Sequence, residues 1–121
     1  MVLDSNVLID YLNGDESVVN QLDAWKQTGQ ALIISSISVA EVLAMPALSP
    51  SSADNARAFL RTFFSRPFDD SVAEVTALFR RKYALKLPDA AIIATAFIYK
   101  TPLVTRDKQL RRIKEITVLG I

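Results

Sequence analysis

Short apolar runs alternate with segments of helical periodicity along the whole chain, and this alternation restricts the fold more than any other feature. Five runs have the length of buried strands: VLD at 2–4, ALIIS at 31–35, RPFD at 66–69, PLVT at 102–105 and ITVLG at 116–120. Alternating elements with largely apolar strands are typical of a parallel sheet covered by helices on both faces. We therefore predict an α/β fold with a central parallel sheet of about five strands.

Helical spacing fills the intervals between these runs. Glycines follow the first two expected helices, where a left-handed residue can end a helix. Helices are expected over residues 7–12 and 16–27, from about Ser38, and over 53–65, 71–86, 89–100 and 107–113. We interpret the aromatic side chains Trp25, Tyr11, Phe63, Phe64 and Phe68 as core residues.

Composition excludes several classes of function. The chain has 121 residues, the length of a single domain (1–121), and it contains no Cys and no His. Disulfide frameworks, Cys/His zinc sites, thiol nucleophiles and His-dependent acid–base catalysis are therefore excluded. The longest apolar stretch, AAIIATAFIY, is about half of the ~20 residues that span a bilayer. With no signal-peptide pattern at its N-terminus, the chain is expected to be cytoplasmic.

Four acids are expected at one edge of the predicted sheet. Asp4 ends the first strand, Glu41 comes shortly after the second, and Asp107 lies two residues beyond the end of PLVT. Asp89 begins the helix that precedes PLVT. In parallel α/β sheets ligands bind beyond the carboxyl ends of the strands, near the point where the strand order reverses. The four carboxylates are therefore candidate site residues.

Each acid also has a purely structural interpretation. Asp4 and Asp107 could cap the helices that follow them, and Ser38 with Glu41 has the spacing of a capping box. Asp89 suits the positive end of a helix dipole. Helix ends accept Ser, Thr, Asn and Asp alike, however, so capping alone does not call for carboxylates that converge.

Converging carboxylates repel one another unless a cation lies among them. Ligands that are all oxygen favour a hard ion such as Mg²⁺ or Mn²⁺, which often shares phosphate oxygens with a substrate. Such an ion makes water a better nucleophile and offsets negative charge on phosphorus oxygens. The acids therefore indicate a metal-dependent phosphoryl-transfer site.

The charges are segregated along the chain, although the net charge is only +1. Residues 1–56 contain one base and seven acids, and the remainder contains thirteen bases and six acids. An acidic pocket beside a basic surface suits a cation next to a polyanion. A solvated helix face is the alternative for the basic residues. The candidate RNA-binding residues are Arg80, Arg81, Lys82, Lys86, Arg106, Lys108, Arg111 and Arg112.

Four segments together resemble a known family: VLDSNVLIDYL, ISVAEVLA, LPDAAIIATA and LVTRD. In this order and spacing they are similar to PIN-domain ribonucleases, in particular the VapC-type toxins of toxin–antitoxin pairs. The resemblance implies a three-layer α/β/α sandwich and Mg²⁺- or Mn²⁺-dependent endonucleolytic cleavage of RNA.

The resemblance also assigns roles. It implies that Asp4, Glu41, Asp89 and Asp107 are the catalytic, metal-binding acids, and that Asn6 and Thr105 support them from the second shell. Many VapC-type sequences carry the last acid three residues later, where this chain has Leu110; the T-x-D form with Asp107 also occurs among PIN domains. The implied partners are RNA, an antitoxin protein and a second copy of the chain, with residues 39–48 and 58–64 as candidate interfaces.

Two functional classes remain open at this stage. The first is an active endoribonuclease, and the second is a PIN-like module that binds RNA or a protein without cutting. The complete acidic set favours the first, because a binding module has no use for four converging carboxylates.

Overall fold

The structure is a computed structural model that describes all residues from Met1 to Ile121. A sheet of five parallel strands forms its centre, in the order β3-β2-β1-β4-β5. Six α-helices and one short 3₁₀ helix connect the strands. The strands are β1 (Val2–Leu3), β2 (Ile33–Ser35), β3 (Phe64–Arg66), β4 (Leu103–Val104) and β5 (Val118–Leu119). The predicted α/β fold with a five-stranded parallel sheet is confirmed.

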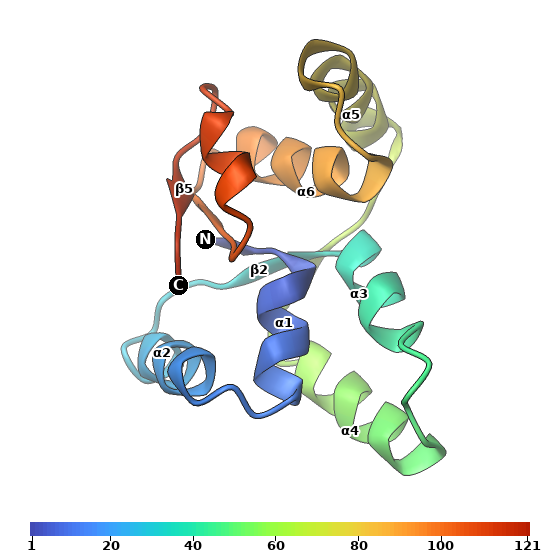
Figure 1. Ribbon diagram of the computed structural model, residues 1–121, viewed down its shortest axis with the longest axis vertical. Helices are drawn as coiled ribbons and strands as arrows, with labels where there is room; N and C mark the ends of the chain where they lie inside the picture. The colour runs from blue at the N-terminus through green and yellow to red at the C-terminus, as the bar shows by residue number, and fades with distance from the viewer.

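Helices cover both faces of the sheet (Figure 1). On one face α5 and α6 pack together, and on the other α1, α2, α3 and α4 form the second helical layer. The helices are α1 (Ser5–Leu12), α2 (Glu16–Gln27), α3 (Ser36–Leu43), α4 (Pro50–Leu60), α5 (Asp70–Tyr83), α6 (Leu87–Ile98) and the 3₁₀ helix η1 (Lys108–Arg112). None of these helices is both long and apolar enough to cross a membrane.

Alternating residues of the central strands supply two separate cores. Val2 and Leu103 point into the cluster under α5 and α6, whereas Leu3 and Val104 point into the cluster under α1 to α4. All four are fully buried. Successive side chains of a strand face opposite sides of its sheet, so a strand covered on both faces must be apolar throughout. This requirement explains the continuous apolar runs of the sequence.

The strand order reverses between β1 and β4. From β1 the chain adds β2 and then β3 on one side, and it later returns to add β4 and β5 on the other. In parallel α/β folds, ligands bind in the crevice beyond the carboxyl ends of the strands at such a switch point. We use the word crevice for this place between the ends of β1 and β4. The chain places Asp4 directly after β1 and Thr105 directly after β4.

Several predicted boundaries are wrong. The third strand is 64–66 and not RPFD at 66–69, because Pro67 has no N–H to continue the ladder with β2. The helix predicted over 53–65 spans 50–60, because Pro50 is suited to the first turn of a helix and Ser49 caps it. The helix predicted from about Ser38 begins at Ser36.

The longest helix ends earlier than predicted. Helix α5 stops at Tyr83 and not at Lys86, because Ala84 adopts a left-handed conformation with φ 54° and ψ 45°. Phe64 is also not a core residue: its side chain is 60% exposed because β3 is an edge strand. Phe63 is buried as predicted, and Tyr11, Trp25 and Phe68 pack partly buried against the two cores.

The conformation of Ala84 leads to a stability prediction. A left-handed conformation is unfavourable for a residue with a Cβ and is normal for Gly. Ala84→Gly should therefore raise the free energy of unfolding by about 0.5–1 kcal/mol, after the greater freedom of Gly in the unfolded chain is subtracted. Urea denaturation measures this change. The matched control is Ala77→Gly, at an exposed position inside the same helix, which should lower it by about 1 kcal/mol. A loss of stability in both variants would contradict the prediction.

Candidate active site

Asp4 follows β1 directly, at the carboxyl end of the sheet where β1 pairs with β4. Its residue is only 5% exposed, and both carboxylate oxygens are engaged. Oδ1 accepts the backbone N–H of Ser5 at 2.7 Å, and Oδ2 accepts the hydroxyl of Thr105 at 2.6 Å. Because Asp4 is also the N-cap of α1, its capping interpretation is confirmed, but the bond to Thr105 lies outside any cap. The carboxylate thus caps a helix and faces the crevice at once.

Glu41 reaches the same crevice from α3. Its Oε1 accepts the hydroxyl of Ser5 at 2.6 Å, and the Ser5 and Ser38 hydroxyls lie 2.9 Å apart. The capping-box interpretation of Ser38 and Glu41 is wrong, since α3 is capped by Ser35, whose hydroxyl accepts from Ile37 N–H. Residues three apart lie on one face of a helix, so Ser38 and Glu41 both point toward α1.

Asp89 lies in the first turn of α6, where no side chain caps the helix. Burial raises the pKa of its carboxyl group above the ordinary value, and the negative charges of Asp107 and Glu41 raise it further, while Lys86 lowers it. Asp89 therefore lies within electrostatic range of two of the other predicted acids.

The pKa of Asp4 is raised to about 6 from 3.8. Burial is the main cause, the bonds from Thr105 and Ser5 oppose it, and the charges of Asp89 and Glu41 add to it. The four predicted acids thus form one group of mutually repelling charges, drawn from the ends of β1 and β4 and from the helices α3 and α6.

Asp107 has two roles, like Asp4. Its carboxylate caps η1 by accepting the N–H of Gln109 at 3.0 Å, as the structural interpretation predicted. Its own N–H donates to the hydroxyl oxygen of Thr105 at 3.0 Å. Its side chain is half-buried beside Asp89. These two hydrogen bonds therefore fix the loop after β4 between Thr105 and the start of η1.

Thr105 connects these groups. It donates to Asp4 and accepts from Asp107 N–H and, at 3.3 Å, from the Asn6 side-chain amide. The amide oxygen of Asn6 accepts the N–H of Arg106 at 3.3 Å. Thr105 is thus in direct contact with Asp4 and Asp107, whereas Asn6 reaches them only through Thr105.

Sequence reasoning missed Ser5 and Ser38 as parts of the site. Both are buried, with 6% and 0% of the residue exposed, and they join α1 to α3 beside Glu41. The sequence did contain a relevant pattern, S-x-x-E, which puts Ser38 and Glu41 on one helix face. This spacing suits either a helix cap or two side chains that contact the same residue. Because α3 begins at Ser36, Ser38 lies inside the helix and cannot be its cap, so the second explanation holds.

The oxygen donors fit a hard cation, although they do not form a complete cage. No group of three acids is arranged so that it could hold a metal ion by itself. Mg²⁺ typically takes one or two carboxylates and completes its shell with water and substrate phosphate. The buried Asp4 and the half-buried Asp89, both with a raised pKa, are the carboxylates that could serve in this way. The donor set therefore suits a site that water and phosphate complete.

The predicted RNA-binding residues divide into two groups. Four are engaged within the protein: Arg80 with the Leu85 carbonyl, Lys82 with Glu115, Arg106 with Asp10 and Asp15, and Arg112 with the Tyr83 carbonyl. The other four are exposed and make no side-chain bond within the protein: Arg81, Lys86, Lys108 and Arg111. Arg106 is therefore largely neutralised, whereas the second group is available to an anion.

The fold and the crevice define a three-layer α/β protein with an acidic site at its topological switch point. A family model of the PIN domain matches residues 1–116. The chain belongs to the PIN domain family.

Solved structures agree with this assignment. A chain of a toxin–antitoxin complex from Klebsiella pneumoniae is 33% identical; the match covers 98% of this chain and 94% of that one, with a TM-score of 0.83. A chain of FitAcB from Neisseria gonorrhoeae is 25% identical over 98% of this chain and 95% of that one, with a TM-score of 0.75. A chain of VapBC2 from Rickettsia felis shares the fold at 19% identity, covering 99% and 97%, with a TM-score of 0.85. No curated protein matched the sequence. The predicted resemblance to PIN domains of toxin–antitoxin complexes is thus confirmed.

The raised pKa of Asp4 predicts how stability depends on pH. An acid whose pKa is higher in the folded state holds its proton more tightly when folded, so its stabilising contribution is complete below pH 3.8 and is lost as the pH rises through about 6. Wild type should therefore lose roughly 1–2 kcal/mol of unfolding free energy relative to Asp4→Asn between pH 5 and pH 8. Chemical denaturation of both proteins in chelator measures this. A difference that stays constant across this pH range would contradict the prediction.

Proposed function

We propose that this protein is a metal-dependent endoribonuclease and the toxin of a toxin–antitoxin pair. One observation carries the proposal: four acids, from four separate parts of the chain, converge at the switch point of the sheet, and one of them is buried. Bringing like charges together in a poorly solvated crevice destabilises the folded protein unless a cation offsets them. A phosphodiester next to such a cation is the substrate that this chemistry suits.

Asp4 and Asp89 would hold the Mg²⁺ or Mn²⁺ ion, and Asp107 and Glu41, whose charges act on the pKa of Asp89, would contribute directly or through water. An ion held there would lower the pKa of the attacking water and offset negative charge on the phosphorus oxygens. The supporting bonds matter as much as the ligands, because groups behind a ligand fix its orientation. Thr105 has this role for Asp4, and Ser5 has it for Glu41.

Glu41 is the proton acceptor in this proposal. Its Oε1 accepts the Ser5 hydroxyl, and its Oε2 makes no hydrogen bond within the protein. The oxygen of a water forms a bond to phosphorus as its proton passes to Oε2, and the bond from phosphorus to the 3′ oxygen breaks. The 3′ oxygen takes a proton from solvent, which leaves a 3′-hydroxyl and a 5′-phosphate.

RNA would lie along the exposed basic side chains at the edge of the crevice. Lys86 precedes the helix of Asp89, and Lys108 follows Asp107 directly. Both are exposed and make no bond within the protein. Contacts between such basic side chains and RNA phosphates give affinity but do not select a nucleotide sequence.

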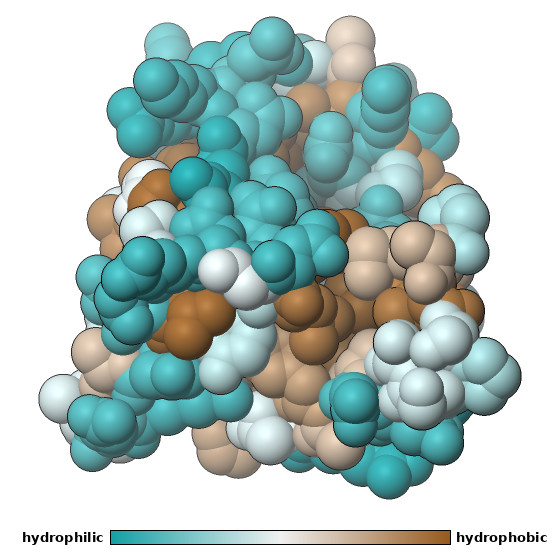
Figure 2. All heavy atoms as spheres, turned by 60° about the horizontal axis from the view of Figure 1, so that its bottom comes forward, coloured by the Kyte–Doolittle hydropathy of each residue, from teal (hydrophilic) through white to brown (hydrophobic).

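A protein partner is supported by the solved structures that resemble this chain. Those described above are complexes of a toxin with an antitoxin or VapBC and FitAcB assemblies, and we propose the same kind of partner here. A groove of about 480 Å³ between α3 and α4 has an apolar lining that includes Val39, Leu43 and Leu60. Figure 2 looks onto the side of the molecule that carries α1, α2 and α4, where apolar surface lies open between polar patches. This groove coincides with the interface regions predicted at 39–48 and 58–64, and a homodimer is proposed alongside the antitoxin complex.

One substitution distinguishes a role of Asp4 in cleavage from its role as the N-cap of α1. Asp4→Asn keeps a good N-cap residue and removes the charge. We expect wild type with Mg²⁺ or Mn²⁺ to cut structured RNA, and we expect cutting to be lost with chelator and to fall at least 100-fold, by order of magnitude, in Asp4→Asn. Product formation on labelled RNA measures this.

Asp69→Asn is the matched control. Asp69 caps α5 by accepting Val72 N–H at 3.0 Å, and it lies outside the acidic group, so its variant should cut as wild type does. Full activity in Asp4→Asn would make that residue only a cap. An absence of cutting by metal-loaded wild type would favour the non-cleaving binding module.

Salt dependence tests the RNA surface. Each phosphate contact that is lost should lower the slope of log affinity against log salt by about 1, so Lys86→Gln and Lys108→Gln should each have this effect. Lys100→Gln is the control, because Lys100 follows the C-terminal end of α6, at the far end from Asp89. Equal slopes for all three variants would show that RNA does not contact this edge.

A further inference from the structure

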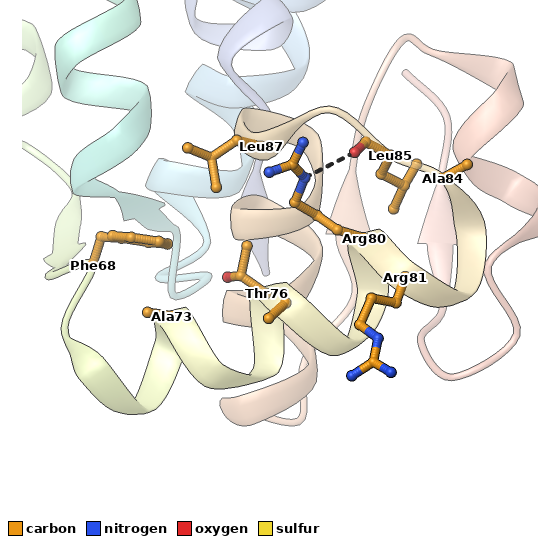
Figure 3. Close-up of a pocket in the computed structure, with 9 residues that line it drawn as sticks. Phe68, Ala73, Thr76, Arg80, Arg81, Ala84, Leu85 and Leu87 are labelled. Carbon is orange, nitrogen blue, oxygen red and sulfur yellow. Dashed lines mark hydrogen bonds between the residues drawn. The ribbon is translucent and has the colours of Figure 1, made fainter.

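A concave site that none of the four acids lines lies between α5 and the start of α6. It is a cavity of about 610 Å³ between α5, the turn that follows it and the segment after β3. Figure 3 shows Phe68 and Leu87 across from one another and Arg80 between Leu87 and Leu85. The remaining lining is mainly small side chains of α5. The cavity is therefore open, largely apolar and bordered by a cation.

The cavity and the acids share one edge of the sheet. Phe68 follows the carboxyl end of β3, and β3 lies two strands from β1, or about 10 Å. Leu87 and Asp89 both lie in the first turn of α6, about 3 Å apart along its axis, and their side chains leave different sides of the helix. Phe68 N–H also donates to the Ser36 hydroxyl at 2.9 Å, at the start of the helix that carries Glu41. A chain with one phosphate at the acids would thus place a neighbouring nucleotide at this cavity.

The lining is suited to a planar, aromatic ligand attached to an anion. Phe68 packs partly buried against the core under α5 and α6, which fixes its position, and it still lines the cavity. Arg80 donates its Nε to the Leu85 carbonyl at 3.1 Å, so its terminal amino groups are held in place and remain available. Figure 3 shows this guanidinium turned toward Leu87, whereas that of Arg81 points away. An aromatic ring and a positioned guanidinium are the two features by which proteins hold unpaired bases.

We propose that this cavity is a subsite for one unpaired nucleobase of the RNA, next to the nucleotide whose phosphate is cut. The base stacks on Phe68 against Leu87, and Arg80 contacts the base edge or the adjoining phosphate. This proposal rests on the proposed function, and it adds that the substrate must be single-stranded beside the cleavage point, since a paired base cannot enter a cavity. The subsite would accept any unpaired base that can stack on Phe68, because stacking does not distinguish strongly between bases.

The test uses a single-stranded oligoribonucleotide of about eight residues, joined by phosphorothioate linkages that resist hydrolysis, and measures binding to the full chain in Mg²⁺ by fluorescence polarisation. Phe68→Leu keeps apolar bulk and removes the aromatic face, and it should weaken binding about tenfold, the loss expected for one base stack. Phe64→Leu is the matched control, because this neighbouring Phe is 60% exposed and does not line the cavity; it should change binding less than twofold.

Abasic probes make the test specific. One abasic position, and only one, should weaken wild-type binding to the same degree, and Phe68→Leu should then cause no further loss. Equal binding by Phe68→Leu and Phe64→Leu, with wild type still cutting RNA, would overturn the subsite and leave the proposed function intact. An absence of RNA binding and of cutting by wild type would overturn both.

Two further outcomes are decisive. If Phe68→Leu converts a dimer to a monomer in sedimentation and RNA binding is unchanged, the cavity is a contact between copies and the proposal is wrong. If Phe68→Leu does not fold, wild type is crosslinked to an oligonucleotide that carries 4-thiouridine. Adducts on peptides with Phe68, Thr76 or Leu87 would support the subsite, and adducts confined to other peptides would overturn it.

Discussion

The 2.6 Å hydrogen bond from Thr105 to Asp4 joins the carboxyl ends of β1 and β4, and the rest of the site is arranged around it. These two residues are 101 positions apart and become neighbours only because β1 pairs with β4 in the sheet. The bond offsets part of the cost of burying a carboxylate. Because Thr105 also accepts from Asn6 and Asp107, one hydroxyl orients polar groups from both strand ends.

Burial of the charged Asp4 side chain destabilises the folded protein, and a helix cap alone does not require a charge at this position. A cap at the start of α1 needs only a short polar side chain. A charge there, with Asp89 and Glu41 near enough to raise its pKa, is reasonable where a cation is bound for part of the working cycle. The acids do not form a complete cage, so in the proposed function water, and phosphate oxygens when RNA is bound, would complete the coordination.

The sequence allowed the sheet, its parallel sense and the acidic group to be predicted, because buried parallel strands must be apolar and their carboxyl ends must meet at one edge. It did not allow the ends of α5 or β3 to be predicted, since these depend on the left-handed Ala84 and on where Pro67 interrupts pairing. Ser5 and Ser38 escaped notice because their hydroxyls meet only after α1 and α3 pack. The pairing of Arg106 with Asp10 and Asp15 likewise depends on tertiary structure.

The proposed function requires that the four acids bind a divalent cation. Direct counting of bound Mn²⁺ by electron paramagnetic resonance, with no RNA present, tests it on wild type, Asp89→Asn and the control Asp70→Asn, in which an exposed acid at the start of α5 is changed. We predict saturable binding of Mn²⁺ by wild type and by the control, and at least tenfold weaker binding by Asp89→Asn. Equal binding by all three proteins, or no bound Mn²⁺ in wild type at millimolar concentration, would contradict the claim.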